Sequence, residues 1–167
     1  KTPIFIHLPQ GEKEKFSGIV DLVQNKFFSY DQEGDGKGKP KDVPAGISEE
    51  MEISHAELME AVAEVDDELI EIYLENGELA EEEFSRGFKE GIQNGELIPV
   101  LCGSALKNIG VDLLLQAVVK YLPSPANRAP VTAKKVDDGS AVNLSSSSNE
   151  STSALVFKTV ADPYAGK

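Results

Sequence analysis

The chain has 167 residues, of which 29 are acidic and 16 basic, so its formal net charge at pH 7 is −13. This length suits one domain or slightly more, and a hydrophobic content of 40% excludes a disordered acidic tail. No apolar run approaches the roughly 18 residues of a transmembrane helix. So negative a chain is also a poor candidate for direct nucleic-acid binding, which requires clustered lysine and arginine.

The beginning of the sequence and its cysteine content suggest a cytoplasmic origin. The first ten residues show no signal-peptide pattern, and the sequence does not begin with Met, so we expect an excised piece of a longer protein. Cys102 is the single cysteine, which excludes an internal disulfide and is compatible with a reducing compartment. We therefore expect a cytoplasmic location, with an organelle as the open alternative.

In the first part of the chain the pattern predicts strands. Residues 4–8, 16–23 and 27–30 are rich in β-branched and aromatic side chains and lie between turn signals, which predicts a meander of two or three antiparallel strands. Residues 31–47 are rich in Gly, Pro, Asp and Lys. They predict a loop in which no side chain packs.

Helical periodicity then replaces the strand pattern. Apolar residues from Ser54 to Asn76 fall on one stripe and predict one long helix, with Ser54 as N-cap, Glu57 completing a capping box, and Gly77 ending it. Residues 80–94 predict a second helix with its phenylalanines facing inward.

The rest of the chain alternates between strand, helix and linker patterns. Residues 97–102 form a nearly continuous apolar run, typical of a strand that is buried on both faces, and residues 111–121 predict a third helix. Residues 124–151 are rich in Pro and Ser and predict a linker. Residues 152–161 alternate like a strand, but no partner strand follows them.

Neither metal binding nor catalysis is predicted from the residue spacing. The acids between Asp31 and Asp42 are spaced like those of a calcium loop, but a strand and not a helix precedes them, and prolines interrupt the pattern. His7 and His55 fit no metal-ligand spacing. Cys102 lies in an apolar run, where a cysteine packs as a small hydrophobic side chain. We expect no metal site and no catalytic residue.

The acidic residues are concentrated in one segment. Residues 49–96 hold 17 acids against Arg86 and Lys89, whereas the remainder is nearly neutral. Seven of these acids recur at three- and four-residue steps, opposite the apolar stripe of the predicted long helix: Glu57, Glu60, Glu64, Asp67, Glu68, Glu71 and Glu75. Like charges at this spacing repel one another. Two interpretations remain open, a solvated polar face and a docking face for a basic partner.

Five blocks of the sequence, taken in their order along the chain, resemble bacterial-type translation elongation factor G. They are Phe16–Val23, Glu60–Leu69, Asn94–Asn108, Tyr121–Pro125 and Ser153–Lys167. Other ribosomal GTPases, of the ribosome-protection and release-factor types, are similar more loosely. A different alternative is a stand-alone acidic helical module for protein interactions.

The resemblance implies an α+β fold in which antiparallel strands and helices form an insert of a GTPase domain. Residues 1–97 would be this insert, the G prime subdomain. Residues 98–126 would supply the last strand, the guanine-motif loop and the last helix of the α/β GTPase domain. Residues 127–151 would be a linker, and residues 152–167 the first strand of a truncated β-barrel domain.

The resemblance also implies a function and partners. In the family, Ser104, Ala105 and Leu106 would form the guanine loop, with the Ala105 N–H meeting the guanine carbonyl oxygen and Ser104 shaping the loop. The acidic helix resembles the contact for the basic C-terminal domain of the ribosomal stalk protein. The full-length parent would use GTP and Mg²⁺ to drive translocation of tRNA and mRNA on the ribosome.

The residues that bind phosphate and Mg²⁺ in such GTPases have no counterpart in this sequence. It holds no Gly-x-x-x-x-Gly-Lys-Ser/Thr pattern, and Asn25-Lys26 lacks the Asp that should follow two places on, where Phe28 stands. We therefore expect no cofactor and no enzyme activity in this chain by itself.

Overall fold

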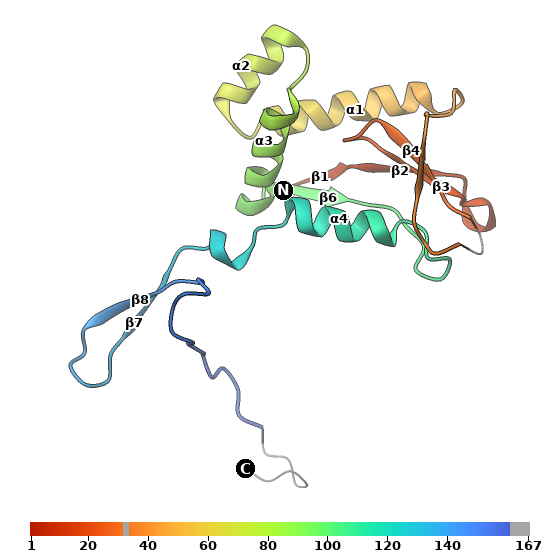
Figure 1. Cartoon of the computed structure of the whole chain (residues 1–167). Coiled ribbons are helices and arrows are strands. Elements are labelled where there is room, and N and C mark those ends of the chain that lie inside the picture. The colour runs from red at the N-terminus through yellow and green to blue at the C-terminus, as the bar shows by residue number, and fades with distance from the viewer. Residues whose placement is uncertain (32–33, 161–167) are drawn as a thin grey trace. The chain divides into compact units, whose positions relative to one another are not determined.

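The computed structural model describes residues 1–31 and 34–160. Contacts divide the chain into two compact units, Lys1–Leu122 and Pro123–Lys167, which are described separately. The α+β fold class is confirmed (Figure 1). Within the described residues, no helix combines the length and apolar character needed to cross a membrane.

The first unit contains two sheets. One is a parallel pair in which Thr2 lies opposite Leu97; its strands are β1 (Thr2–Phe5) and β6 (Leu97–Val100). The other is an antiparallel meander in sequence order; its strands are β2 (His7–Gln10), β3 (Gly18–Asp21), β4 (Lys26–Ser29) and β5 (Lys39–Lys41). The predicted antiparallel meander is confirmed.

The prediction that nothing packs in residues 31–47 is wrong at two places. β5 pairs with β4, with Pro40 opposite Phe28. A proline is tolerated there because β5 is an edge strand, where a missing N–H breaks no ladder bond. Ile47 is only 8% exposed and belongs to the main hydrophobic core.

The predicted long helix is two helices. α1 (Ser48–Ala63) begins before Ser54, which is therefore not an N-cap, and α2 (Asp67–Asn76) ends at Gly77 as predicted, with φ of +77° at this glycine. The helix is interrupted at Asp66, whose backbone is extended. The Asp66 carboxylate accepts the N–H of Glu68 at 2.9 Å. Asp66, which the sequence pattern placed inside one long helix, is thus the N-cap of α2.

The helix predicted over residues 80–94 is confirmed. α3 (Glu81–Asn94) buries Phe84 and Phe88, whose ring centroids lie 5.3 Å apart. The Phe88 ring meets the Tyr121 ring edge-on, with the two centroids 4.8 Å apart. At Gly87 an added Cβ would collide with the side chain of Leu69, so the absence of a side chain there lets α3 approach α2.

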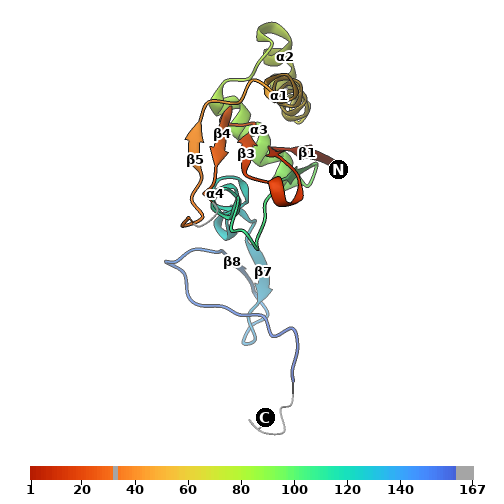
Figure 2. The same ribbon diagram turned by 90° about the vertical axis from the view of Figure 1, so that its right-hand side faces the viewer.

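The meander lies between α1 and the last helix of the unit, α4 (Val111–Tyr121), in both views (Figures 1 and 2). Consecutive residues of β3 pack into the hydrophobic clusters on opposite sides of the meander. Val20 joins the core cluster that contains Leu58 of α1, while Ile19 joins a second cluster that contains Leu113 of α4. A short 3₁₀ helix, η1 (Lys13–Lys15), connects β2 to β3.

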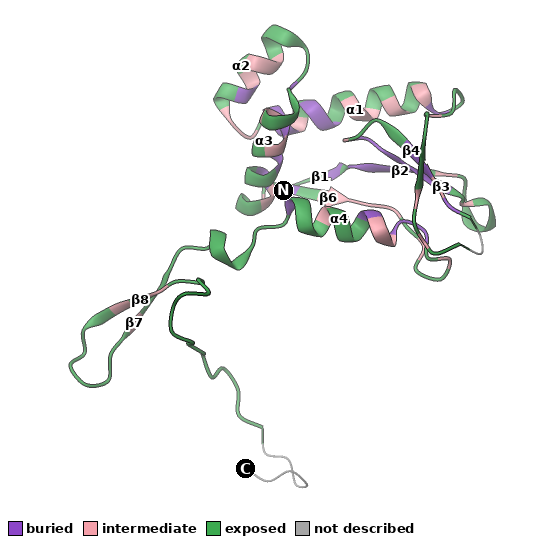
Figure 3. Ribbon diagram, viewed as in Figure 1, coloured by how far each residue is buried: buried purple, intermediate pink, exposed green. Residues whose placement is uncertain are grey.

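The prediction that the strand at 97–102 is buried on both faces is wrong. Ile98 is 45% exposed, so the face of β6 that carries this residue is not covered. Among the described strands, β6 pairs with β1 alone. The bounds predicted for α4 are confirmed, but Leu114, Leu115 and Val118 are exposed and only its Leu113 side packs inward (Figure 3).

The second unit corrects two further predictions. The predicted linker contains a short 3₁₀ helix, η2 (Pro125–Asn127), and an antiparallel hairpin of β7 (Val131–Lys134) and β8 (Ala141–Leu144). The predicted strand at 152–161 is not a strand over its described residues, 152–160, where Phe157 is 91% exposed. An extended segment that pairs with no neighbour has no ladder to hold it. Residue 161 lies outside the described residues.

Replacing Asp66 with Ala should lower stability by about 1 kcal/mol, because the Glu68 N–H loses its cap acceptor. Urea unfolding of this variant and of a Glu71→Ala control, which removes a carboxylate from the same helix without touching the cap, provides the measurement. The control should stay within about 0.5 kcal/mol of the unaltered chain. Equal midpoints for the two variants would contradict the cap.

Candidate functional site

The loop between β6 and α4 is a tight, hydrogen-bonded turn. Ser104 and Ile109 exchange backbone hydrogen bonds, with N···O distances of 2.9 and 3.0 Å. Inside this bridge the Asn108 N–H donates to the Ala105 carbonyl at 3.3 Å, and the Lys107 N–H donates to Ser104 Oγ at 3.3 Å. Ser104 therefore closes the turn through both its backbone and its side chain.

The tip of this loop is left free. Ala105 is exposed, Leu106 is 99% exposed, and neither backbone N–H donates a hydrogen bond to another described residue. A hollow of about 240 Å³ beside the loop is lined mainly by apolar side chains, among them Leu101, Val111 and Leu114. The three predicted site residues thus lie together, and the loop offers two backbone donors to an acceptor such as a carbonyl oxygen.

These donors cannot hold a ligand by themselves. Each hydrogen bond adds about 0.5–1.5 kcal/mol net, whereas micromolar affinity needs about 8 kcal/mol. The loop can therefore form one side of a binding site, but other residues would have to supply most of the affinity.

The seven predicted acidic side chains are all exposed, but they do not form one helical stripe. Glu57 and Glu60 lie on α1, Glu64 is its C-cap and the other four lie on α2, because the helix is broken at Asp66. Glu68 accepts two hydrogen bonds of 3.0 Å from the guanidinium of Arg86 on α3. The charge of Glu68 is therefore compensated by a base on a different helix.

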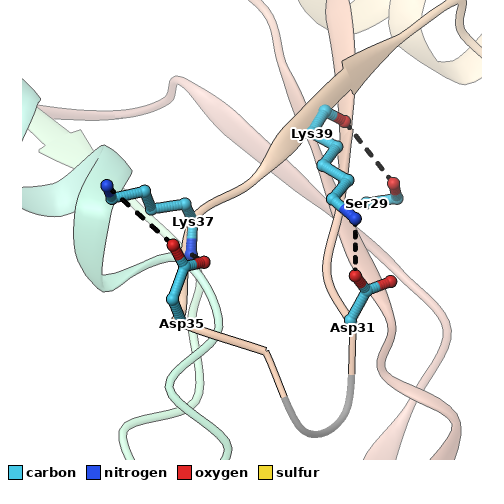
Figure 4. A network of polar contacts seen from close by, with 5 residues as sticks. All are labelled: Ser29, Asp31, Asp35, Lys37 and Lys39. Carbon is cyan, nitrogen blue, oxygen red and sulfur yellow. Dashed lines mark hydrogen bonds and ion pairs between the residues drawn. The ribbon is translucent and has the colours of Figure 1, made fainter.

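In the loop that resembles a calcium site, two carboxylates pair with lysines (Figure 4). Asp31 Oδ2 lies 2.6 Å from Lys39 Nζ, and this ammonium lowers the pKa of Asp31. Asp35 accepts the backbone N–H of Lys37 at 3.1 Å and lies 3.9 Å from its ammonium. Among residues 1–31 and 34–160, no three His, Cys, Asp or Glu side chains are grouped to share a metal ion.

A buried polar pair in the meander was not predicted. His7 of β2 and Asp21 of β3 face each other in the strand register, and both are buried. The Asp21 carboxylate accepts hydrogen bonds from the backbone N–H groups of Val23 and Gln24 and from the Gln24 side chain, at 2.8–2.9 Å. Burial lowers the pKa of His7, although the Asp21 charge opposes this shift. Spacing offered no signal, because 14 residues separate the pair in the sequence.

Cys102 packs as predicted, against the cluster around Ile19 and Leu113. Burial raises the pKa of its thiol to about 11. A thiol with so high a pKa is almost entirely protonated at neutral pH and is a poor nucleophile.

Iodoacetamide should therefore alkylate Cys102 in the folded chain roughly 20-fold more slowly than in the urea-unfolded chain at pH 8. The smaller thiolate fraction outweighs the higher intrinsic nucleophilicity of a high-pKa thiolate. Each unit rise in pH should speed the native reaction about tenfold until the pKa is approached. Mass spectrometry of timed samples provides the measurement, and equal native and unfolded rates would contradict the burial.

Comparisons with known proteins agree with the pattern of the sequence. The family described as the elongation factor Tu GTP-binding domain matches residues 13–124. Elongation factor G of Thermotoga maritima is 39% identical over 166 residues, covering 99% of this chain and 24% of the relative. Elongation factor G of Thermotoga sp. strain RQ2 is 40% identical with the same coverage. The chain thus spans about a quarter of the length of these relatives.

A solved structure of a protein from Thermus thermophilus is similar in fold. Its TM-score is 0.67 at 32% identity, and the match covers 79% of this chain and 20% of that one. The resemblance seen in the sequence blocks is confirmed by these matches.

Proposed function

Because the chain belongs to the family of the elongation factor Tu GTP-binding domain and is of the elongation-factor-G type, we propose that it is part of a GTPase that drives translocation of tRNA and mRNA on the ribosome. The match over 99% of the chain to proteins named elongation factor G carries the proposal. The same names favour this type over ribosome-protection and release-factor GTPases. An acidic module unrelated to GTPases has no support, since the family match spans residues 13–124.

Within this proposal the domain boundaries are those that the resemblance implies. Residues 1–97 form the insert, residues 98–126 complete the GTPase domain, and residues 127–151, which hold the β7–β8 hairpin, connect it to the following domain. The parallel pairing of β1 with β6 crosses the first boundary. The insert and the end of the GTPase domain would therefore share a sheet.

We assign Ser104, Ala105 and Leu106 to the guanine side of a GTP site. The free N–H groups at the tip of this turn fit the carbonyl oxygen of guanine, and Ser104 Oγ accepts the Lys107 N–H that keeps the turn closed. When bound, GTP with Mg²⁺ would supply the phosphoryl chemistry. No residue of this chain matches a phosphate cradle, so a protein of the relatives' length would have to provide it.

We expect no GDP binding and no GTP hydrolysis by this chain alone. Isothermal calorimetry at about 100 μM protein should give only heats of dilution, since one or two backbone bonds fall far short of micromolar affinity. Unaltered heats after removal of Mg²⁺ provide the control. Saturable binding, or GTP turnover that survives further purification, would contradict this expectation.

We further propose that the acidic surface of α1 and α2 binds the basic C-terminal domain of the ribosomal stalk protein, and the ribosome through it. Apart from Glu68, none of the seven acids forms an ion pair with a described residue. These six uncompensated charges lie within residues 57–75, on two consecutive helices, so their potentials add and would attract a basic domain.

Reversal of Glu60, Glu64 and Glu71 to Lys should weaken binding to that stalk domain, mainly by slowing association, because surface charges steer the encounter. The loss should shrink as salt rises past about 0.15 M, where the Debye length is about 8 Å. Surface plasmon resonance against the immobilised stalk domain provides the measurement.

The matched control reverses Glu12, Asp137 and Glu150, three exposed acids outside the acidic surface, and changes the net charge equally. If both triple variants associate at the same rate at low salt, the acidic surface is only a solvated face.

A further inference from the structure

The loop that carries Ser104, Ala105 and Leu106 is attached to the meander at three separate points. The first is Asp112, in the first turn of α4 directly after the loop. Its Oδ1 accepts the Tyr30 hydroxyl at 2.7 Å and its Oδ2 accepts the Gly38 N–H at 2.8 Å. Tyr30 follows β4 and Gly38 precedes β5, so one carboxylate joins α4 to both sides of the β4–β5 connection.

The Tyr30 hydroxyl is suited to donate the hydrogen bond to Asp112 over a wide pH range. Its side chain is buried with Ile109 and Leu113 in the second core cluster. Burial, together with the hydrogen bond to Asp112, raises the pKa of the Tyr30 hydroxyl well above its ordinary value. The hydroxyl therefore keeps its proton, and the Asp112 carboxylate keeps its partner, throughout the neutral range.

The second attachment is Lys107, within the loop itself. Its ammonium donates to the backbone carbonyls of Lys13 and Glu14 in η1, at 3.3 and 2.8 Å. The backbone N–H of Lys107 donates to Ser104 Oγ. One residue therefore connects the turn that Ser104 closes to the segment between β2 and β3.

The third attachment is steric. Gly36 has φ of +76°, and a Cβ added to it would collide with the side-chain amide of Asn108. Asn108 itself has a positive φ of +51°, a left-handed conformation that asparagine adopts more readily than most residues other than glycine. The backbone at Gly36 thus lies directly against the side chain of Asn108, next to the bridge that closes the loop.

These attachments all lie at positions 107, 108 and 112, and none touches the two free N–H groups of Ala105 and Leu106. Binding to a donor that is already fixed avoids the entropy cost of ordering it. Because the loop offers only these two donors, its rigidity affects how much each hydrogen bond adds to the binding free energy.

We propose that Asp112 and Lys107 are positioning residues, through which the meander holds the guanine-side loop in its binding shape and slows nucleotide release. This inference rests on the proposed function for its ligand, but the attachment itself is a property of this chain. It makes the insert a support of the nucleotide site in addition to a docking surface.

The decisive experiment measures amide hydrogen exchange by NMR in this chain. In Asp112→Ala, the N–H groups of Asn108 and Ile109 should exchange about tenfold faster, the change expected when hydrogen bonds of ordinary net strength are lost. Those of α1 should not change. Asp112→Asn, which keeps one acceptor oxygen for Tyr30, should restore part of the protection.

Tyr30→Phe removes the same hydrogen bond from the other side while keeping the buried ring. Its effect on the loop should not add to that of Asp112→Ala in the double variant. Gln116→Ala, on an exposed position of α4, is the matched control and should leave the loop unchanged. Unchanged exchange at Asn108 and Ile109 in Asp112→Ala, or equal acceleration throughout α1, would overturn the positioning role.

A second arm separates this inference from the proposed function. This chain is grafted in place of the matching residues of Thermotoga maritima elongation factor G, and release of a fluorescent GDP analogue is timed. Asp112→Ala and Lys107→Met should each release it several-fold faster than the unaltered graft, with an unchanged unfolding midpoint. Faster exchange in the chain with unchanged release would overturn the link to the nucleotide. A folded graft that binds no nucleotide would overturn the proposed function and leave the attachment established.

Discussion

The first unit depends on the burial of β3 on both of its faces. Ile19 and Val20 are consecutive and both fully buried, one among the residues around Leu113 and the other among those around Leu58. Successive side chains of a strand point to opposite faces, so this strand faces a core on each side. Each buried aliphatic side chain adds about 1.5–3 kcal/mol. The acidic helices on one side and the α4 segment on the other are therefore held by the same short strand.

Two groups of carboxylates in the chain are distinguished by their partners. Asp21, Asp66 and Asp112 each accept a backbone N–H, and in doing so fix a turn, a helix start and a contact between α4 and the β4–β5 connection. The seven acids of the acidic surface are exposed, and among the described residues a basic partner is found for Glu68 alone. The carboxylates of the first group form hydrogen bonds within the fold, whereas most of those in the second group face solvent. Short aspartate side chains suit the first use because they reach nearby backbone donors.

Most element positions followed from patterns that depend on neighbours in sequence. α3 and α4 were predicted within a residue because apolar periodicity and terminal glycines are local signals. The break at Asp66 was missed because an aspartate reads equally well as a polar helix residue and as a cap. The segment 152–160 was predicted as a strand from alternation alone, and alternation does not supply the second strand that a ladder requires.

The sequence by itself determined that the chain is an α+β, acid-rich relative of elongation factor G, and that Ser104, Ala105 and Leu106 share one loop. These properties reside in composition, short-range periodicity and contiguous residues. Only the tertiary structure decided that β1 pairs with β6, that Arg86 meets Glu68, and that Tyr30 and Gly38 meet on the carboxylate of Asp112. Each of these contacts joins residues that are separated by 18 to 95 positions. No periodicity encodes such a separation, because the packing of whole elements sets it.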